Sequence, residues 1–417
     1  MSDQRPDLDT LVDDLVEGRR RFHELASLEP EEAAEVRRRT LSRLKDTSLD
    51  HIGSFSLDAE RASTRHCENF MGVAQVPMGV TGPLKILGEH VTEDEEVFVP
   101  LATTEGALIA SISRGCRAVR EAGGAIVRVD DVGMTRAPVF RTDGIEETRR
   151  FIGWVEDHED EIRELVEGTS RFLKLQRVRP QTFGSSVYLR FQFSSGDAMG
   201  MNMATIACDR AVRDLIEPAT GVPCVALSGN FCVDKKPSAV NFLEGRGKRV
   251  FAEVVLERPV LERVLKTRAE SLLEVQYRKN MLGSIAAGAM GFNAHYANVL
   301  AAFFIATGQD LAQVAEGAMG VTCVEARGDE GVYMSVFLPD LPLGAVGGGT
   351  GLATQREALA VLGITPREDE PGWAAMRMAE IVAATVLAGE ISLMAAFTSG
   401  DLARAHQRLG RGEPGGR

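Results

Sequence analysis

Hydrophobic residues recur at helical spacing near the N-terminus, where Leu11, Leu15, Phe22 and Leu25 stand among Asp, Glu and Arg. This pattern predicts a charge-rich helical segment over residues 1–64 that packs on a larger unit. Further along, Thr103 or Thr104 is predicted to cap a helix through the stretch ALIASISRGCRAVREA. Glu105 would then lie in its first turn, where the helix dipole favours a carboxylate.

The pattern changes to a two-residue alternation in the middle of the chain, where alternate residues from Val187 to Phe193 are apolar. Extended segments are predicted at 125–129, 138–141, 171–178, 187–193 and 222–227, with helices at 145–166 and 201–216. The order β-α-β-β-α-β is that of the ferredoxin-like split βαβ arrangement. We therefore expect a small inserted domain over residues 130–226, which returns the chain into the loop SGNFCVDKKP.

The second half is predicted to alternate again between strands and helices. Strands are expected at 250–255 and 333–337, and helices from Pro259 to about 278, at 353–362 and at about 372–398. Residues 280–309 carry no formal charge but include Asn293, His295 and Asn298, which favours one buried helix over a membrane span. The predicted fold class is α+β, with a large mixed α/β domain (65–129 and 227–417) around a long buried helix.

Length and charge limit the classes of function. A chain of 417 residues is expected to form two or three domains. The net charge of −13 disfavours a nucleic-acid partner, since phosphate-binding surfaces are basic. The six cysteines form no CxxC pair and no ladder with metal-ligand spacing, which predicts free thiols in a reducing cytoplasm and no metal site. The charged N-terminus predicts neither a signal peptide nor a membrane anchor.

Candidate chemistry centres on the loop 228–249. Lys235 and Lys236 lie there between an acid and a proline, in a chain where most basic residues are arginine. From this segment alone, a solvated basic turn explains the pair better than a catalytic role. Asp310 directly follows the uncharged stretch, where a buried acid would need a partner, and Lys235 is the candidate. A buried Lys235–Asp310 pair with a nearby glutamate would leave one carboxyl with a raised pKa. His406 lies on a glycine-flanked segment that would suit an acid that moves in and out of a site, although a lone histidine near a C-terminus is more often a surface residue.

Two further stretches have unusual composition. DAMGMNM (197–203) alternates three methionines, which indicates either filling of core gaps or a loop that faces a ligand. The glycine run GAVGGGTG (344–351) matches the dinucleotide-binding pattern GxGxxG only weakly. It fits a backbone loop against a phosphate or a nicotinamide, and it fits a simple turn about as well.

Ten stretches together resemble one enzyme family. In chain order they are ENFMGVAQVPMGVTGP, VPLATTEGALIAS, GMTRAPV, DAMGMNMAT, LSGNFCVDKKP, EGRGK, GFNAH, ATGQD, VGGGT and AGEISLMAA. Over about residues 66–408 the chain resembles 3-hydroxy-3-methylglutaryl-coenzyme A (HMG-CoA) reductase in its class I, soluble prokaryotic form. The resemblance implies four-electron reduction of a thioester to mevalonate and coenzyme A, with two NADPH consumed.

The resemblance also implies roles for four catalytic residues. Lys235 would hold the thioester carbonyl oxygen as negative charge develops, since a preorganised charge at an oxyanion is a large catalytic contribution. Glu105 would supply a proton to the aldehyde oxygen, and Asp310 would bind Lys235 and tune that glutamate. His406 would protonate the departing coenzyme A thiolate, a role that suits its ordinary pKa of about 6.5.

Binding residues and assembly follow from the same resemblance. Arg128 and Lys236 would face the substrate carboxylate, and Arg171 would favour NADPH through its 2′-phosphate. Ser113 stands where relatives often have Asn, on the coenzyme A side. A homodimer or dimer of dimers with shared sites is implied. The other implied substrate contacts are Ser228, Asp234, His295 and Asn298, and the other cofactor contacts are Ser170, Asp197, Met199, Gly200, Met201, Asn202, Gly347 and Thr350.

Three alternatives stay open on the sequence. The same reaction could use NADH, as in the class II enzymes, although Arg171 argues against this. Lys235 could be a Schiff-base nucleophile of an aldolase, which would need a lysine of lowered pKa. A non-catalytic protein that binds coenzyme A or a nucleotide is the third alternative.

Overall fold

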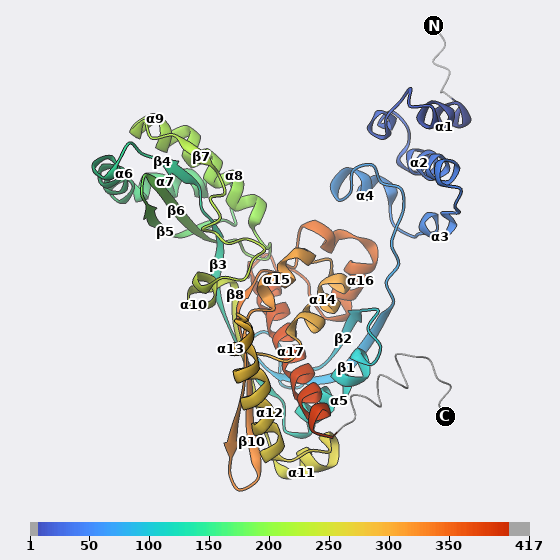
Figure 1. Cartoon of the computed structure of the whole chain (residues 1–417), viewed down its shortest axis with the longest axis vertical. Helices are drawn as coiled ribbons and strands as arrows, with labels where there is room; N and C mark the ends of the chain where they lie inside the picture. The colour runs from blue at the N-terminus through green and yellow to red at the C-terminus, as the bar shows by residue number, and fades with distance from the viewer. Residues whose placement is uncertain (1–6, 400–417) are drawn as a thin grey trace.

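The computed structural model describes residues 7–399, and its first helices lie together at the upper right of Figure 1. Leu11, Leu15 and Val36 are buried in the apolar cluster between the first two long helices, as the helical spacing predicts. The elements are α1 (Leu8–Val16), η1 (Phe22–Leu25), α2 (Pro30–Lys45), α3 (Asp50–Gly53) and α4 (Ala59–Arg65).

A central sheet follows, in which β3, β8, β10 and β9 lie side by side and antiparallel. Alternate residues of β8 (Val250, Ala252 and Val254) are buried on one face, because successive side chains of a strand point to opposite sides. At the other edge β1 runs parallel to β3 and pairs with β2. The strands are β1 (Met78–Leu87), β2 (Glu96–Ala102), β3 (Ala125–Arg136), β8 (Arg246–Leu256), β9 (Val321–Arg327) and β10 (Gly331–Leu341).

The long buried helix is α17 (Trp373–Ser399), which contacts β3, β8 and β10 together with α5 (Leu108–Glu121) and α14 (Tyr296–Thr307). The prediction that 280–309 forms the long helix is wrong. Gly288 has a φ of +65°, a left-handed conformation that ends helices, and a loop separates it from α14. Among the described residues one helix, Trp373–Thr398, is long and apolar enough to span a membrane, yet 83% of its most apolar window is buried inside the protein.

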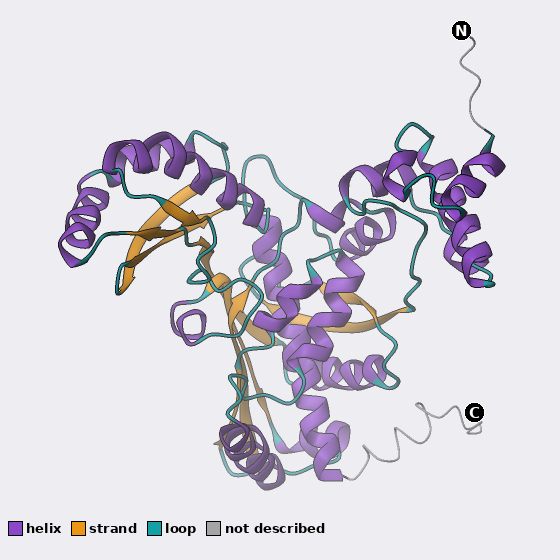
Figure 2. Cartoon of the chain, turned by 45° about the horizontal axis from the view of Figure 1, so that its top comes forward, coloured by secondary structure: helices purple, strands orange, loops and turns teal. Residues whose placement is uncertain are grey.

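A second group of strands lies at the upper left of Figure 2, joined to the first through the bent strand β3. Here β6 pairs with β5 on one side and with β3 and β4 on the other, and β7 pairs with β4. Helices cover one face around a separate apolar cluster that includes Phe140, Phe151 and Phe191. The elements are β4 (Val139–Arg141), α6 (Ile145–Asp157), α7 (Glu159–Glu167), β5 (Lys174–Phe183), β6 (Ser186–Ser194), α8 (Met201–Ala211), η2 (Val212–Ile216), α9 (Glu217–Thr220) and β7 (Cys224–Ala226).

Several predicted boundaries are wrong, for local reasons. The helix predicted over 145–166 breaks at His158, after which three acidic residues begin α7, as the dipole of a new helix favours. The helix predicted from Pro259 stops at Lys266, whose φ is +57°. The strand β1 lies outside the predicted strands. Gly82 and Pro83, residue types that favour turns, fall at the irregularity between Thr81 and Leu84 in the β1–β2 pairing.

The remaining short helices connect these layers. They are α10 (Ala239–Glu244), α11 (Arg258–Val260), η3 (Leu261–Leu265), α12 (Ala269–Val275), η4 (Gln276–Gly283), α13 (Ser284–Ala287), η5 (Leu311–Gln313), α15 (Val314–Gly317), η6 (Gly348–Gly351) and α16 (Ala353–Val361).

Candidate active site

Lys235 and Asp310 are in direct contact. The Lys235 Nζ lies 2.8 Å from Asp310 Oδ2, and both side chains are partly exposed, at 44% and 35%. The predicted contact is therefore present, but the pair is not buried as expected. The hydrogen bond and charge of Asp310 raise the pKa of Lys235, so its ammonium stays protonated at neutral pH. A half-exposed, charged ammonium is accessible to a substrate oxygen.

Glu105 lies just before α5 and not in its first turn, since Ala107 takes the cap position with a φ of +74°. Its N–H donates to Thr103 Oγ1 at 3.0 Å. Its exposed carboxylate accepts a hydrogen bond from Asn298 Nδ2 at 3.1 Å, so the structure brings the predicted acid to α14. Burial raises the pKa of Glu316, whose carboxylate accepts the Lys235 N–H and which the sequence did not single out.

The start of α14 carries two further predicted residues, His295 and Asn298. His295 is buried, and among residues 7–399 its Nε2 has no hydrogen-bond partner. The backbone N–H groups of Ala294 and His295 each donate to the carboxylate of Glu390 on α17 at 2.8 Å. Glu390 thus holds the backbone that presents Asn298 to Glu105.

The other predicted substrate residues fall into separate sets of contacts. Ser228 Oγ lies 3.5 Å from Cys232 Sγ, and Lys236 Nζ donates to the Asp234 carbonyl at 3.2 Å. Arg128, on β3, donates to the carbonyls of Leu87 and Val127 and lies 3.6 Å from a Glu89 oxygen. The structure therefore does not pair Arg128 with Lys236 within one chain.

Asp234 turns inward from the loop. Its Oδ1 accepts hydrogen bonds from Arg246 at 2.9 Å and from Gln313 at 3.0 Å. Burial acts to raise its pKa, but Arg246 and Gln313 outweigh burial, and the pKa of Asp234 is lowered. This carboxylate is ionised and serves inside the protein as an anchor of the loop.

The methionine segment and the glycine run meet, although 140 residues of sequence separate them. Ala198 and Val346 form a parallel bridge, and the Asp197 carbonyl accepts the Ala345 N–H at 2.7 Å. A Cβ at Gly344 would clash with the Met199 backbone, so the close approach requires glycine. Gly200, with a φ of +97°, precedes Met201 and Asn202 at the start of α8.

Ser170 and Arg171 lie at the edge of this region. The neighbouring Phe172 side chain lies against Gly196, next to Asp197, and the Arg171 guanidinium stacks 4.4 Å from the Phe172 ring centre. Thr350 donates to the Gly347 carbonyl at 2.7 Å, which shapes the end of the glycine run. The predicted cofactor residues thus come from three segments that converge.

A family model described as hydroxymethylglutaryl-coenzyme A reductase matches residues 33–411. The chain belongs to this family. It is 49% identical over 405 residues to 3-hydroxy-3-methylglutaryl-coenzyme A reductase of Methanothermobacter thermautotrophicus, covering 97% of this chain and all of that protein. It is 50% identical over 380 residues to the same enzyme of Pyrococcus horikoshii, covering 91% and 92% of the two chains.

Solved structures of the HMG-CoA reductase family share the fold. The class II enzyme from Streptococcus pneumoniae bound to NADPH superposes with a TM-score of 0.65 at 18% identity, over 94% of this chain and 97% of that one. The fold is accordingly a mixed helix and sheet fold of this family.

The converging segments fit a dinucleotide such as NADPH. Gly347 and Gly348 have φ values of +85° and +52°, and within the described part of the chain no atom lies within 4 Å of where their Cβ atoms would be. Opposite this open backbone, α8 begins, and the first N–H groups of a helix suit a phosphate or carboxamide oxygen. His406 lies outside the described residues. The Ser113 hydroxyl lies 2.9 Å from Thr81 Oγ1.

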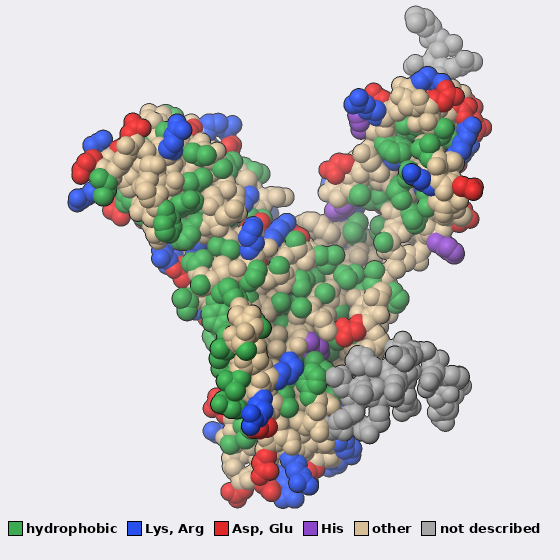
Figure 3. Space-filling view, in the orientation of Figure 1, with side chains coloured by type: hydrophobic (Ala, Val, Ile, Leu, Met, Phe, Trp, Pro, Cys, Tyr) green, Lys and Arg blue, Asp and Glu red, His purple; other side chains and the backbone are tan. Residues whose placement is uncertain are grey.

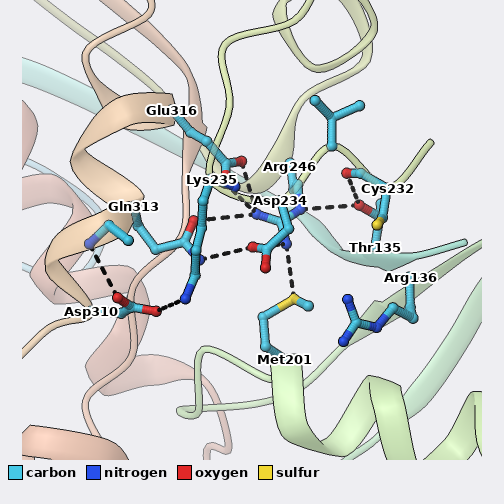
Figure 4. A network of polar contacts seen from close by, with 12 residues as sticks. Thr135, Arg136, Met201, Cys232, Asp234, Lys235, Arg246, Asp310, Gln313 and Glu316 are labelled. Carbon is cyan, nitrogen blue, oxygen red and sulfur yellow. Dashed lines mark hydrogen bonds and ion pairs between the residues drawn. The ribbon is translucent and has the colours of Figure 1, made fainter. Parts of the chain in front are cut away.

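Sequence reasoning missed the buried network behind Lys235, shown in Figure 4. Arg246 belongs to the stretch EGRGK that carries the family resemblance, but no role was assigned to it. Its partner Glu316 lies 70 residues later and is fully buried. A charged residue in a short amphipathic helix gives no local signal of burial, so only the tertiary structure reveals this pair.

Proposed function

We propose that the protein reduces HMG-CoA to mevalonate and coenzyme A with NADPH. The thioester carbonyl is first reduced to a hemithioacetal, loss of the coenzyme A thiolate gives mevaldehyde, and the aldehyde is reduced to the alcohol. NADPH supplies the hydride for each reduction, so two are consumed. The Lys235–Asp310 pair is the observation that carries this proposal within the family, because it keeps a charged ammonium accessible on the loop.

Lys235 would stabilise the oxygen on which negative charge develops in both reductions. Its pKa is raised by Asp310, so it remains a cation at neutral pH, and a preorganised cation at a developing oxyanion lowers the barrier. The same raised pKa argues against a Schiff-base role, which requires a neutral amine. Glu105, held by Asn298, would deliver a proton to the aldehyde oxygen, and His406 would protonate the thiolate.

The remaining predicted contacts fit this reaction as proposals. Ser228, Asp234, Lys236, His295 and Arg128 would bind the hydroxymethylglutaryl and coenzyme A parts. The cofactor would lie between α8 and the glycine run, with Arg171 near the 2′-phosphate. The NADPH-bound class II enzyme has the same overall fold, so neither the fold nor the use of NADPH separates the two classes. We propose the class I form because the ten sequence motifs resemble it.

We also propose the division into units that the sequence predicts: 1–64, 65–129 with 227–417, and an inserted 130–226. Separate apolar clusters in the N-terminal helices, around α17 and behind β6 support it. The strand order β7, then β3 with β4, then β6 and β5, fits a ferredoxin-like insert. A cytoplasmic location fits the net charge of −13 and the burial of α17.

Self-association is proposed from exposed apolar side chains on η4 and α13. Tyr277, Leu282 and Ile285 are 55%, 42% and 59% exposed, and Figure 3 shows hydrophobic side chains gathered over this part of the surface. Contiguous apolar surface of this kind marks interfaces. Because the segment continues directly into the loop that carries His295, a homodimer or dimer of dimers would place a second chain beside the site.

The test is NADPH absorbance after the purified protein is mixed with HMG-CoA, with NADH in parallel. We expect two NADPH consumed per HMG-CoA and little oxidation of NADH. Oxidation of NADH alone would overturn the cofactor assignment. No oxidation of either, by a folded protein that binds coenzyme A, would favour a binding protein instead.

A further inference from the structure

Arg246, at the start of β8, joins four separate segments of the chain through one buried guanidinium. Nη1 donates to both oxygens of Glu316, at 2.8 and 3.0 Å. Nη2 donates to Asp234 at 2.9 Å and lies 2.8 Å from Met201 Sδ, while Nε donates to Thr135 Oγ1 at 3.1 Å. The planar fork of arginine allows all these contacts at once, which a lysine could not make.

Glu316, on α15, connects this cation to the backbone of Lys235. It is fully buried, and its Oε1 also accepts the Lys235 N–H. Lys235 has a φ of +62°, a left-handed conformation that a residue with a side chain keeps only when its surroundings hold it. Glu316 therefore fixes the residue whose Nζ lies 2.8 Å from Asp310.

A second buried carboxyl completes the network. Asn241 Nδ2 donates to Asp340 Oδ2 at 2.8 Å and to the Val233 carbonyl at 3.1 Å, so a further backbone group of the loop is held. Burial and the adjacent Glu316 raise the pKa of Asp340, so this carboxyl holds a proton more readily than an exposed aspartate. Both oxygens of Glu316 accept hydrogen bonds from Arg246, so Glu316 is the carboxylate that pairs with this cation.

We propose that Glu316 and Arg246 are positioning residues, which hold the Lys235 ammonium where the thioester oxygen will lie and tie the loop to Met201 at the start of α8. The inference rests on the proposed reductase function. Preorganisation of this kind affects the chemical step more than substrate binding, because a small displacement of a charge at the reacting oxygen costs rate.

The experiment compares two buried glutamates that each accept backbone N–H groups. Glu316→Gln removes the charge at nearly unchanged volume. Glu380→Gln, on α17, is the matched control, because Glu380 is equally buried and accepts N–H groups of Glu89, His90 and Val91. We expect both variants to lower Tm. Only Glu316→Gln should lower kcat, by about 10- to 100-fold, with KM for HMG-CoA within about threefold.

The outcomes separate the two proposals. An unchanged kcat in folded Glu316→Gln, or an equal loss in Glu380→Gln, would overturn the positioning role while leaving the reductase function intact. Inactivity of the unsubstituted protein would overturn the function itself. If Glu316→Gln does not fold, Arg246→Lys is the second test, because it keeps a buried cation but removes the planar guanidinium that makes several hydrogen bonds at once. We expect the same selective loss of kcat, and an unchanged kcat there would also contradict the inference.

Discussion

At the scale of single residues, the position of Lys235 depends on its backbone as much as on its side chain. Lys235 has a left-handed φ of +62°. On one side of it Asp234 points inward to Arg246, and on the other side Lys236 stays exposed. The side chain then meets Asp310 at the far end of α14. One residue therefore combines a constrained backbone with an accessible charge.

Lys235→Ala should remove the proposed oxyanion contact and leave the fold intact, since the side chain is 44% exposed. We expect kcat to fall by about 10²- to 10³-fold, the usual effect of deleting one donor to an oxyanion. Steady-state NADPH oxidation measures the loss, and circular dichroism verifies the fold. Turnover within a few-fold of the unsubstituted protein would refute the oxyanion role.

At the scale of elements, α17 serves as a frame that holds other segments by buried charges. Glu380 accepts the N–H groups that precede β2, and Glu390 accepts those that precede α14. A buried carboxylate is tolerated at these places because several donors satisfy it. The helix thus holds the backbone before α14, the helix that carries Asn298, and Asn298 in turn donates to Glu105.

Glu390→Ala should destabilise the protein, because it leaves the N–H groups of Ala294 and His295 and the Thr322 hydroxyl without their acceptor. Each buried group left unsatisfied costs about 1–3 kcal/mol, so we expect a loss of about 3 kcal/mol or more. Urea unfolding measures it. Glu390→Gln, which retains an acceptor oxygen, should lose less, and equal losses would contradict this explanation.

Asp340→Asn should change how stability depends on pH. The pKa of Asp340 is raised in the folded state, so the folded protein binds a proton that the unfolded chain releases above about pH 4. Its contribution to stability is complete below that pH and is lost as pH rises toward the folded pKa, by about 1.4 kcal/mol per pH unit. Asparagine mimics the protonated form without titrating.

Urea unfolding of both proteins at pH 5, 6 and 7 tests this prediction. The stability of the unsubstituted protein relative to Asp340→Asn should decrease at each step. A constant difference across this range would show that Asp340 is ionised in the folded protein.

At the scale of the whole molecule, two groups of strands with their own apolar clusters meet through β3 and the Lys235 loop (Figure 1). The network around Arg246 lies at this junction, since it joins β8 and α15 to Met201 of α8. The apolar surface of η4 and α13 directly precedes, along the chain, the loop that leads into α14. The site therefore adjoins both an internal boundary and the proposed contact with a second chain.

Ile285→Glu should abolish self-association while leaving the fold stable, because a charge placed in an apolar interface loses its hydration. Val361→Glu is the matched control, as Val361 is an equally exposed aliphatic residue, at 59%, on α16. Sedimentation velocity should report a monomer only for Ile285→Glu. An unchanged oligomer would place the interface elsewhere.

The sequence by itself determined the family, the alternating segment of β6, a strand at the position of β8, and the identity of Lys235, Asp310 and Glu105 as candidates, because such features are local patterns of residues. That DAMGMNM and the glycine run would both contact the cofactor, and so lie close together, was implied only by the family resemblance. Only the tertiary structure decided which helix is buried, that a left-handed glycine divides 280–309, and that Arg246 and Glu316 form a buried pair. Burial and long-range contact depend on how distant segments pack, and no local pattern encodes them.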